Sequence, residues 1–309
     1  MIYQENNQCF ALSIPPRIEI RGILETVMSL AFKRQFSVFY HDIFNYPLTN
    51  EEINFWCPGK KFKDIRIKLE AVEEKDGFFY LKGKESLVVQ RAKRQKLSAK
   101  KIEIAKKGAD AVSFVPFVKL VGVSGALAMK NTEEDADIDL IIICKKYTLW
   151  ITRLLVIFAL DALGIPRRKA GDREEKDKLC LNMWMDEGDL VWDREDRNFY
   201  TAHEIAQILP LVNKDKTYER FIYLNRWVRE YWPNAVGQTK EMREKRTKER
   251  SLIFSVLNFF IYPLEFVAFW VQYIYMKSKI TREVVTPTRA IFHPRDWGKV
   301  VKLKLQRGV

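Results

Sequence analysis

The chain has 309 residues, 47% of them hydrophobic, and a formal net charge of +13. This length and apolar content suit two ordinary domains with packed cores, which excludes a globally disordered chain. The charge favours polyanionic partners such as nucleic acid, nucleotides or anionic lipid, although basic side chains scattered over the surface would give the same total.

The four cysteines lie far apart in the sequence, in no CxxC or Cys/His spacing. They are Cys9, Cys57, Cys144 and Cys180. We expect reduced, mostly buried thiols rather than disulfides or zinc ligands. The N-terminal residues lack a basic stretch followed by an apolar run, so no secretory signal is expected. Both observations favour a cytoplasmic location.

Residues 18–94 are predicted to form a small N-terminal module. Gly22–Tyr40 is apolar with helical spacing. Thr49 and Glu52 then have the spacing of a capping box, which predicts the start of a second helix.

The same module is predicted to continue with a basic helix over Lys63–Val72 and a hairpin over Val72–Lys82. Asp76-Gly77 is a typical hairpin turn. Two helices, a basic helix and a hairpin follow one another as in a winged helix, whose basic helix can enter the major groove of DNA. The alternative is a module that serves only packing or dimer contacts. A further basic helix, Arg91–Lys107, either faces solvent or forms a rail for nucleic acid.

The stretch Val121–Ile143 predicts a strand, a tight glycine turn, a short helix, a loop and a second strand. Asp137 and Asp139 lie two residues apart on the second, otherwise apolar strand, so both side chains project from one face. Two like charges on a buried strand are costly unless a cation or hydrogen bonds neutralise them. Mg²⁺, held by oxygen ligands and shared with phosphate, meets that requirement. Upstream, Gly125 allows close approach of backbone to a phosphate at the start of the short helix.

Ser124-Gly125, a spacer and Asp137-Ile138-Asp139 in an apolar strand resemble the DNA polymerase β-like nucleotidyltransferase superfamily. The chain has Ser-Gly-Ala where Gly-Ser is usual. Most of the chain also resembles poorly characterised bacterial nucleotidyltransferase-like proteins. The resemblance implies an α+β fold, with a mixed β-sheet and flanking helices over residues 95–212 and a C-terminal helical region over 213–309.

The resemblance also implies an activity. The protein would transfer a nucleoside monophosphate from an NTP to a hydroxyl of an unknown acceptor, such as a nucleic acid or a protein. Asp137 and Asp139 would bind two Mg²⁺ or Mn²⁺ ions. The expected nucleotide-binding residues are Ser124, Gly125, Ala126 and Lys130.

In this superfamily a later strand commonly supplies a third carboxylate, which takes the proton of the attacking hydroxyl. The predicted strand Leu179–Met185 carries Asn182, and Asp186 follows its end. Either Asp186 is the third catalytic acid or Asn182 fills that position, and Asn can ligate a metal but cannot act as a base. Without the acid, the alternative function is a nucleotide-sensing winged-helix regulator that binds nucleic acid.

Three further helices are expected after Ile143. Tyr147–Leu163 is apolar nearly all round and is predicted to pack on the sheet. Phe199–Ala206 opens another helix, in which a structural role is expected for His203. Tyr218–Tyr231 is predicted to be one amphipathic helix.

Leu252–Met276 is an apolar helix long enough for a membrane span, but Glu265 would be costly in lipid. Its polar residues are Ser255, Asn258, Glu265 and Gln272. We expect this stripe to meet the preceding domain or a partner, including a second copy of the chain. The alternative is peripheral association with an anionic membrane surface. A charged helix is expected over Lys240–Arg250, and a short strand or extended end over Phe292–Val309.

Overall fold

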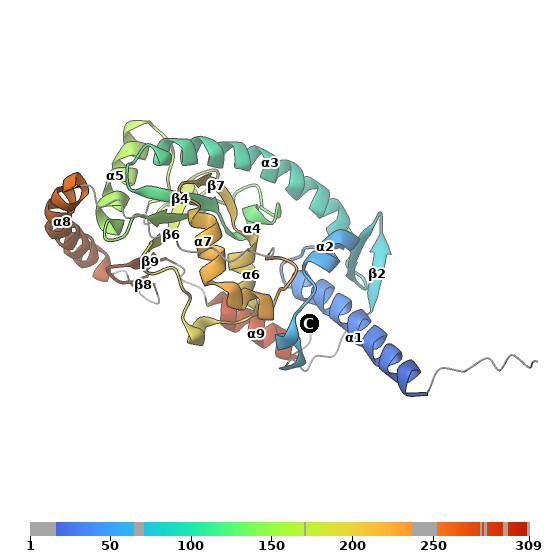
Figure 1. The fold of residues 1–309 in the computed structure, drawn as a ribbon. Coiled ribbons are helices and arrows are strands. Elements are labelled where there is room, and N and C mark those ends of the chain that lie inside the picture. The colour runs from blue at the N-terminus through green and yellow to red at the C-terminus, as the bar shows by residue number, and fades with distance from the viewer. Residues whose placement is uncertain are drawn as a thin grey trace, which may run out of the picture.

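A computed structural model describes residues 17–64, 71–169, 171–236, 252–278, 280, 283–292 and 296–307. These residues form a mixed α+β fold (Figure 1). The helices are α1 (Arg17–Asp42), α2 (Asn50–Phe55), α3 (Ser86–Ser113), α4 (Gly125–Ala128), α5 (Leu149–Ala162), α6 (Phe199–Gln207), α7 (Thr217–Leu224), α8 (Leu252–Lys277) and α9 (Trp297–Arg307), with 3-10 helices η1 (Lys60–Asp64), η2 (Arg194–Asp196) and η3 (Arg226–Glu230). The strands are β1 (Leu48–Thr49), β2 (Val72–Lys75), β3 (Phe78–Leu81), β4 (Val118–Val123), β5 (Ile138–Cys144), β6 (Leu179–Asp186), β7 (Leu209–Asn213), β8 (Val284–Val285) and β9 (Arg289–Ile291).

The larger sheet has the strand order β7-β4-β5-β6-β9-β8. β5 and β6 are parallel, whereas the other neighbours are antiparallel. The stretch Val121–Ile143 therefore forms the predicted strand, turn, short helix and strand, with β4 beside β5. A parallel pair needs a crossover connection, and α5 lies within the one that joins β5 to β6.

Both faces of the central strands are buried, because side chains alternate along β5. Ile141 and Ile143 belong to the core that contains α6 and the N-terminal module. Leu140 and Ile142 belong to the core against α3, α5 and α8. The odd-numbered residues of β5, and so Asp139, face the α6 side.

The N-terminal module contains the predicted capping box and hairpin. The Glu52 N–H donates to the Thr49 hydroxyl, and the Thr49 N–H donates to the Glu52 carboxylate. Asp76 and Gly77 both have positive φ, as a two-residue hairpin turn requires, between β2 and β3. β1 adds a third strand. Most of the predicted basic helix, residues 65–70, lies outside the described residues; η1 covers Lys60–Asp64 before it, and Val72 starts β2.

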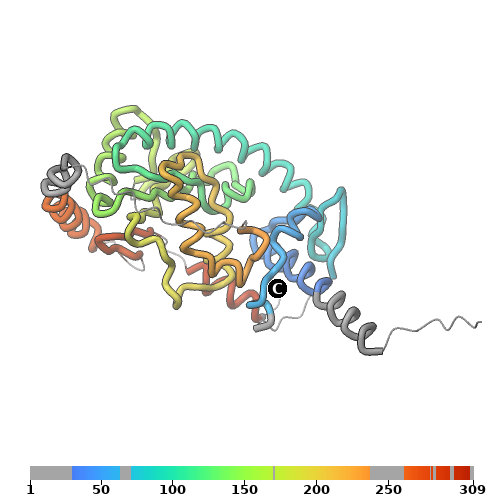
Figure 2. The backbone as a smooth tube through the Cα atoms, viewed as in Figure 1, coloured from blue at the N-terminus to red at the C-terminus, as the bar shows by residue number. Residues whose placement is uncertain are grey.

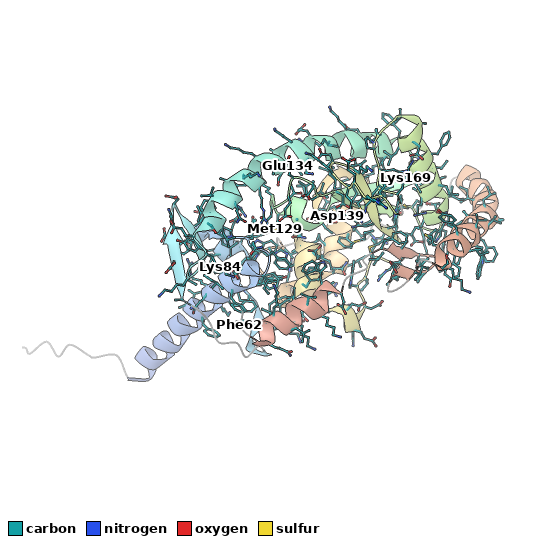
Figure 3. The ribbon with its side chains drawn as sticks, turned by 180° about the vertical axis from the view of Figure 1, so that it is seen from behind. Phe62, Lys84, Met129, Glu134, Asp139 and Lys169 are labelled. Carbon is teal, nitrogen blue, oxygen red and sulfur yellow. The ribbon has the colours of Figure 1, made fainter. Side chains whose placement is uncertain are left out.

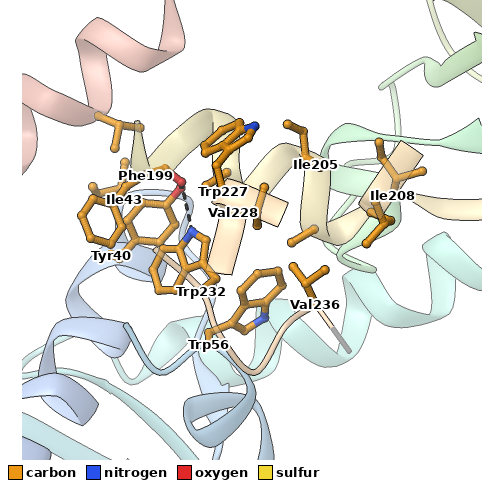
Figure 4. Close-up of a cluster of buried hydrophobic side chains, with 14 of the residues drawn as sticks. Tyr40, Ile43, Trp56, Phe199, Ile205, Ile208, Trp227, Val228, Trp232 and Val236 are labelled. Carbon is orange, nitrogen blue, oxygen red and sulfur yellow. Dashed lines mark hydrogen bonds between the residues drawn. The ribbon is translucent and has the colours of Figure 1, made fainter. Parts of the chain in front are cut away.

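An aromatic cluster joins this module to the rest of the chain (Figure 4). Trp232 is fully buried, stacks on Phe36 of α1 and meets the Tyr40 ring edge to face. Its indole N–H donates to the Phe199 carbonyl at 3.1 Å. Trp56, at the end of α2, lies edge-on to Trp232. The module therefore shares its core with α6 and the segment after η3.

Helix α3 extends the predicted basic helix at both ends, and two of its basic residues are buried. The Arg91 guanidinium donates to Glu52 at 2.6 Å and lies over the Tyr46 ring. Its burial lowers the pKa of Arg91 to about 10. The Lys101 ammonium donates to the carbonyl oxygen of Ala136. These two cations bind neighbouring segments of the chain, so they are not part of an exposed basic surface for nucleic acid.

The C-terminal third differs from the predictions in three places. The expected helix Tyr218–Tyr231 is divided at Asn225 into α7 and η3, because the buried Asn225 side chain bonds to backbone and to the Trp227 indole. The region is not wholly helical, since β8 and β9 complete the large sheet beside β6. The tail forms helix α9 rather than a strand, and its Trp297 packs near Phe44 and Tyr200. This places the C-terminal helix near α1, as the tube in Figure 2 shows.

Helix α8 packs on α5 through its polar side chains. The Glu265 carboxylate accepts from the backbone N–H groups of Trp150 and Ile151, at 2.7 and 2.9 Å. Gln272 donates to the Trp150 carbonyl and accepts from Arg153. The expected contact of the polar stripe with the preceding domain is confirmed for these two residues. The Ser255 and Asn258 side chains lie outside the described part of the chain. None of the described helices combines the length and the apolar character needed to cross a membrane.

Replacing Glu265 with Ala should lower the free energy of unfolding by about 1–2 kcal/mol, because α5 loses the acceptor for two N-terminal N–H groups. Burial raises the pKa of Glu265, and these N–H groups oppose the rise. Urea unfolding at neutral pH measures the loss. The matched control is Glu103→Ala, whose exposed carboxylate bonds only to Lys106 on the surface, and which should change stability by less than about 0.5 kcal/mol. Equal effects of the two substitutions would contradict the capping role.

Candidate functional site

The two predicted acids form a carboxylate pair, Asp137 and Asp139, at the start of β5. With Cys180 of β6 they form a group whose possible ligand atoms all lie within 4.8 Å of one another. Within the described residues, this is the one group of three such side chains that could hold a metal ion. Both acids thus project from the same face, as the spacing predicts. Figure 3 shows Asp139 between Met129, at the end of α4, and Lys169.

The Ser124-Gly125 turn lies directly against Asp139. The Ser124 N–H donates to the Asp139 carbonyl at 3.0 Å, which continues the pairing of β4 with β5. Gly125 has φ +61°, and a Cβ there would lie 2.8 Å from Oδ2 of Asp139. Only glycine therefore brings this backbone so close to the carboxylate without strain. The sequence motif and the carboxylate pair are one site.

A β-bulge on β6 brings Cys180 and Asn182 to the pair. Asp139 lies opposite Cys180, but the next paired residues are Ile141 and Met183, so β6 has one extra residue here. The Asn182 amide donates to Oδ1 of Asp139 at 2.5 Å. Its own carbonyl oxygen, Oδ1, is buried without a hydrogen-bond partner. Asn182 is thus a second polar group beside the pair with an unused acceptor.

The loop before β6 contributes a cation to the site. The Arg168 guanidinium donates to Oδ2 of Asp137 at 2.9 Å and also pairs with Glu175. Arg168 is 41% exposed, whereas the Asp137 side chain is 14% exposed. The charge of Asp137 is thus balanced at the mouth of the site, and no such cation is hydrogen-bonded to Asp139 among the described residues.

Helix α6 adds a further acid, Glu204, whose carboxylate accepts from the Gln207 amide at 2.7 Å and lies near enough to Asp139 for their charges to repel. Burial, followed by repulsion from Asp137, raises the pKa of Asp139 to about 7. Burial, followed by repulsion from Asp139, raises the pKa of Glu204 to about 8. Like-charged neighbours in a poorly solvated site cannot all ionise without a cation. The site therefore contains more carboxyl groups than its own side chains can keep ionised together.

One predicted site residue, Asp186, is not brought to the pair, and the side chains of two others, Lys130 and Ala126, are exposed. Asp186 lies opposite Cys144, at the far end of β6 from Cys180, and its carboxylate accepts from the N–H groups of Tyr147 and Gly188. Because the strands run parallel, Asp186 is carried away from the pair and cannot be its third acid. Lys130 is exposed after α4, where its charge acts on Glu52. Ala126 is exposed on α4.

His203 is part of the aromatic core, as expected for a structural histidine. Its Nε2 lies 3.0 Å from Nε2 of His41, and its ring stacks on Trp56 at 3.9 Å. Burial lowers the pKa of His41 to about 3 and also lowers that of His203. Both rings are thus neutral at physiological pH.

Sequence reasoning missed Arg168 and Cys180. For Cys180 the signal was present, because it precedes Asn182 by two residues on the same predicted strand. Nothing in the local sequence indicates that Arg168 approaches Asp137.

Comparison with known proteins does not extend these observations. The chain matches no protein-family model, and searches of curated proteins and of solved structures gave no significant match.

Proposed function

We propose that the chain is a divalent-metal-dependent nucleotidyltransferase of the DNA polymerase β-like superfamily. It would transfer a nucleoside monophosphate from an NTP to an acceptor hydroxyl, with release of pyrophosphate. The observation that carries the proposal is the placement of Asp137 and Asp139 on one face of β5, against the Gly125 turn. A mixed sheet with helices on both faces, preceded by two helices and a hairpin, is compatible with this superfamily and with a winged-helix-like module.

The donor set fits a divalent cation. The possible ligand atoms of two carboxylates and the Cys180 thiol lie within 4.8 Å of one another, and the adjacent Asn182 has a buried Oδ1 without a hydrogen-bond partner. Oxygen donors suit Mg²⁺ and Mn²⁺, and the thiol shifts the preference toward Mn²⁺. When bound, such an ion would supply Lewis-acid stabilisation of the phosphate oxygens.

The protein's own groups have separable roles in this proposal. Asp139 must be ionised to ligate, so binding of the ion strengthens as the pH rises through about 7. The Asn182 amide fixes the orientation of the Asp139 carboxylate. Arg168, exposed beside Asp137, provides a positive charge for a phosphate at the mouth of the site.

The test is a screen of all four NTPs for pyrophosphate release with Mn²⁺ or Mg²⁺ and candidate hydroxyl acceptors, including RNA, DNA and the protein itself. Asp139→Asn should lower the rate at least about 100-fold, because it removes a charged ligand. The matched control is Asp135→Asn, an exposed residue of the same loop, which should leave the rate unchanged. Pyrophosphate release that persists in Asp139→Asn would contradict the proposal.

A second candidate function is nucleotide sensing without turnover. It is favoured by Asn182, which stands beside Asp139 where a third acid is expected and cannot take a proton. The same screen separates the two functions. Metal-dependent binding of an NTP without pyrophosphate release from any acceptor, lost in Asp139→Asn, would identify a sensor. Salt-dependent DNA binding that persists in Asp139→Asn would assign the nucleic-acid contact to the N-terminal module.

A further inference from the structure

The outer face of α8 is apolar and exposed, the reverse of the usual arrangement of a surface helix. Two of its polar residues, Glu265 and Gln272, are buried against α5. Large apolar side chains point outward, and they include Tyr262, Leu264, Phe266, Val267, Trp270, Val271 and Ile274. Ile274 is 69% exposed and Phe266 is 64% exposed. Monomeric soluble proteins rarely present so many large apolar side chains on one contiguous surface, which is typical of an interaction surface.

The inward polar contacts fix this orientation. Glu265 holds two N–H groups of α5, and Gln272 is bonded to both Trp150 and Arg153. Turning α8 to bury its apolar face would leave these groups without partners. Figure 1 shows α8 at the end of the molecule opposite α1, with α5 on its inner side. The neighbouring helix α5 also exposes Leu154, Leu155 and Phe158.

The charge of the segments that flank α8 distinguishes between the possible partners of its apolar face. The segment that precedes α8 in the sequence, Lys240–Arg250, contains six basic and three acidic residues, and Lys277, Lys279 and Arg282 follow the apolar stretch. Basic residues thus flank the helix at both ends, and the whole chain has a net charge of +13. A second copy on this face, in either direction, would bring like charges together. An anionic lipid surface is complementary to the apolar face and to both flanks.

We propose that α8 is an in-plane membrane anchor, whose outer apolar face inserts into the interfacial region of an anionic bilayer. Exposed Trp270 and Tyr262 belong to the residue types that prefer this depth. The helix lies on the bilayer rather than across it, because its polar face is hydrogen-bonded to α5. The proposal is independent of the nucleotidyltransferase chemistry.

The test uses the full chain and vesicles of phosphatidylcholine alone or mixed with phosphatidylglycerol. We expect co-sedimentation with the mixed vesicles, weakened by added salt. Phe266→Ser combined with Ile274→Ser should lower the partition coefficient roughly 10- to 100-fold, since two inserted side chains are lost. The matched control is Phe114→Ser, which is 84% exposed at the end of α3 and should have no effect.

A second measurement does not depend on polar substitutions. Brominated phosphatidylcholine in the mixed vesicles should quench the fluorescence of the wild type, and Trp270→Phe should remove the larger part of this quenching. Light scattering of the free protein tests the competing occupant. A concentration-dependent dimer that the double substitution dissociates, or an absence of vesicle binding, would overturn the membrane proposal.

Discussion

Replacing Asp139 with Asn should make the metal-free protein more stable at pH 8, by about 2–4 kcal/mol. The pKa of Asp139 is raised to about 7 by burial and by Asp137. The folded state therefore holds a proton that the unfolded state releases near pH 4, and the free energy of unfolding falls as the pH rises from about 4 to about 7. Asn carries no charge and avoids this cost, and it can still accept from the Asn182 amide. A catalytic or ligand-binding group is expected to cost stability in this way.

The same substitution should abolish stabilisation by Mn²⁺. In the wild type, ions that bind only the folded state add RT ln(1 + [Mn²⁺]/Kd), about 2.7 kcal/mol at one hundred times Kd. Urea unfolding of both proteins between pH 4.5 and 8, with and without Mn²⁺, measures both effects. The advantage of Asp139→Asn should shrink as the pH falls toward 4. Asp135→Asn, on the exposed part of the loop, should change neither quantity. An Asp139→Asn protein that is less stable at every pH, or still stabilised by Mn²⁺, would contradict the assignment.

Replacing Trp232 with Ala should lower the free energy of unfolding by about 3–5 kcal/mol. The side chain is fully buried between α1 and α6, and its indole N–H is bonded to the Phe199 carbonyl (Figure 4). The substitution leaves a cavity and an unpaired carbonyl oxygen at the junction of the N-terminal module with the sheet. Urea unfolding monitored by far-UV circular dichroism measures the loss.

Trp270→Ala is the matched control for this prediction. The same side chain is removed from the outer face of α8, where it is 44% exposed. We expect a loss of less than about 1 kcal/mol in the absence of lipid. If the two substitutions had the same effect, the shared core would not be the main attachment of the module. If Trp232→Ala unfolded only part of the protein, the transition would separate into two steps.

Local sequence determined the elements in which the physical cause is local. The capping box at Thr49 needs only Glu52, and the hairpin turn needs only Asp76-Gly77. Alternation along β5 places Asp137 and Asp139 on one face whatever the rest of the chain does. These predictions are confirmed because each rests on residues within one turn or one strand.

The sequence by itself thus determined a mixed fold around a pair of carboxylates beside a glycine turn. Only the tertiary structure decided what surrounds the pair. The parallel direction of β6 and its bulge place Cys180 and Asn182 there and take Asp186 to the far end, while α6 brings in Glu204. The orientation of α8 was also decided at long range, because Glu265 is satisfied by N–H groups of α5 that lie more than a hundred residues earlier. Strand pairing and helix docking depend on contacts between distant segments, which no local pattern of residue types encodes.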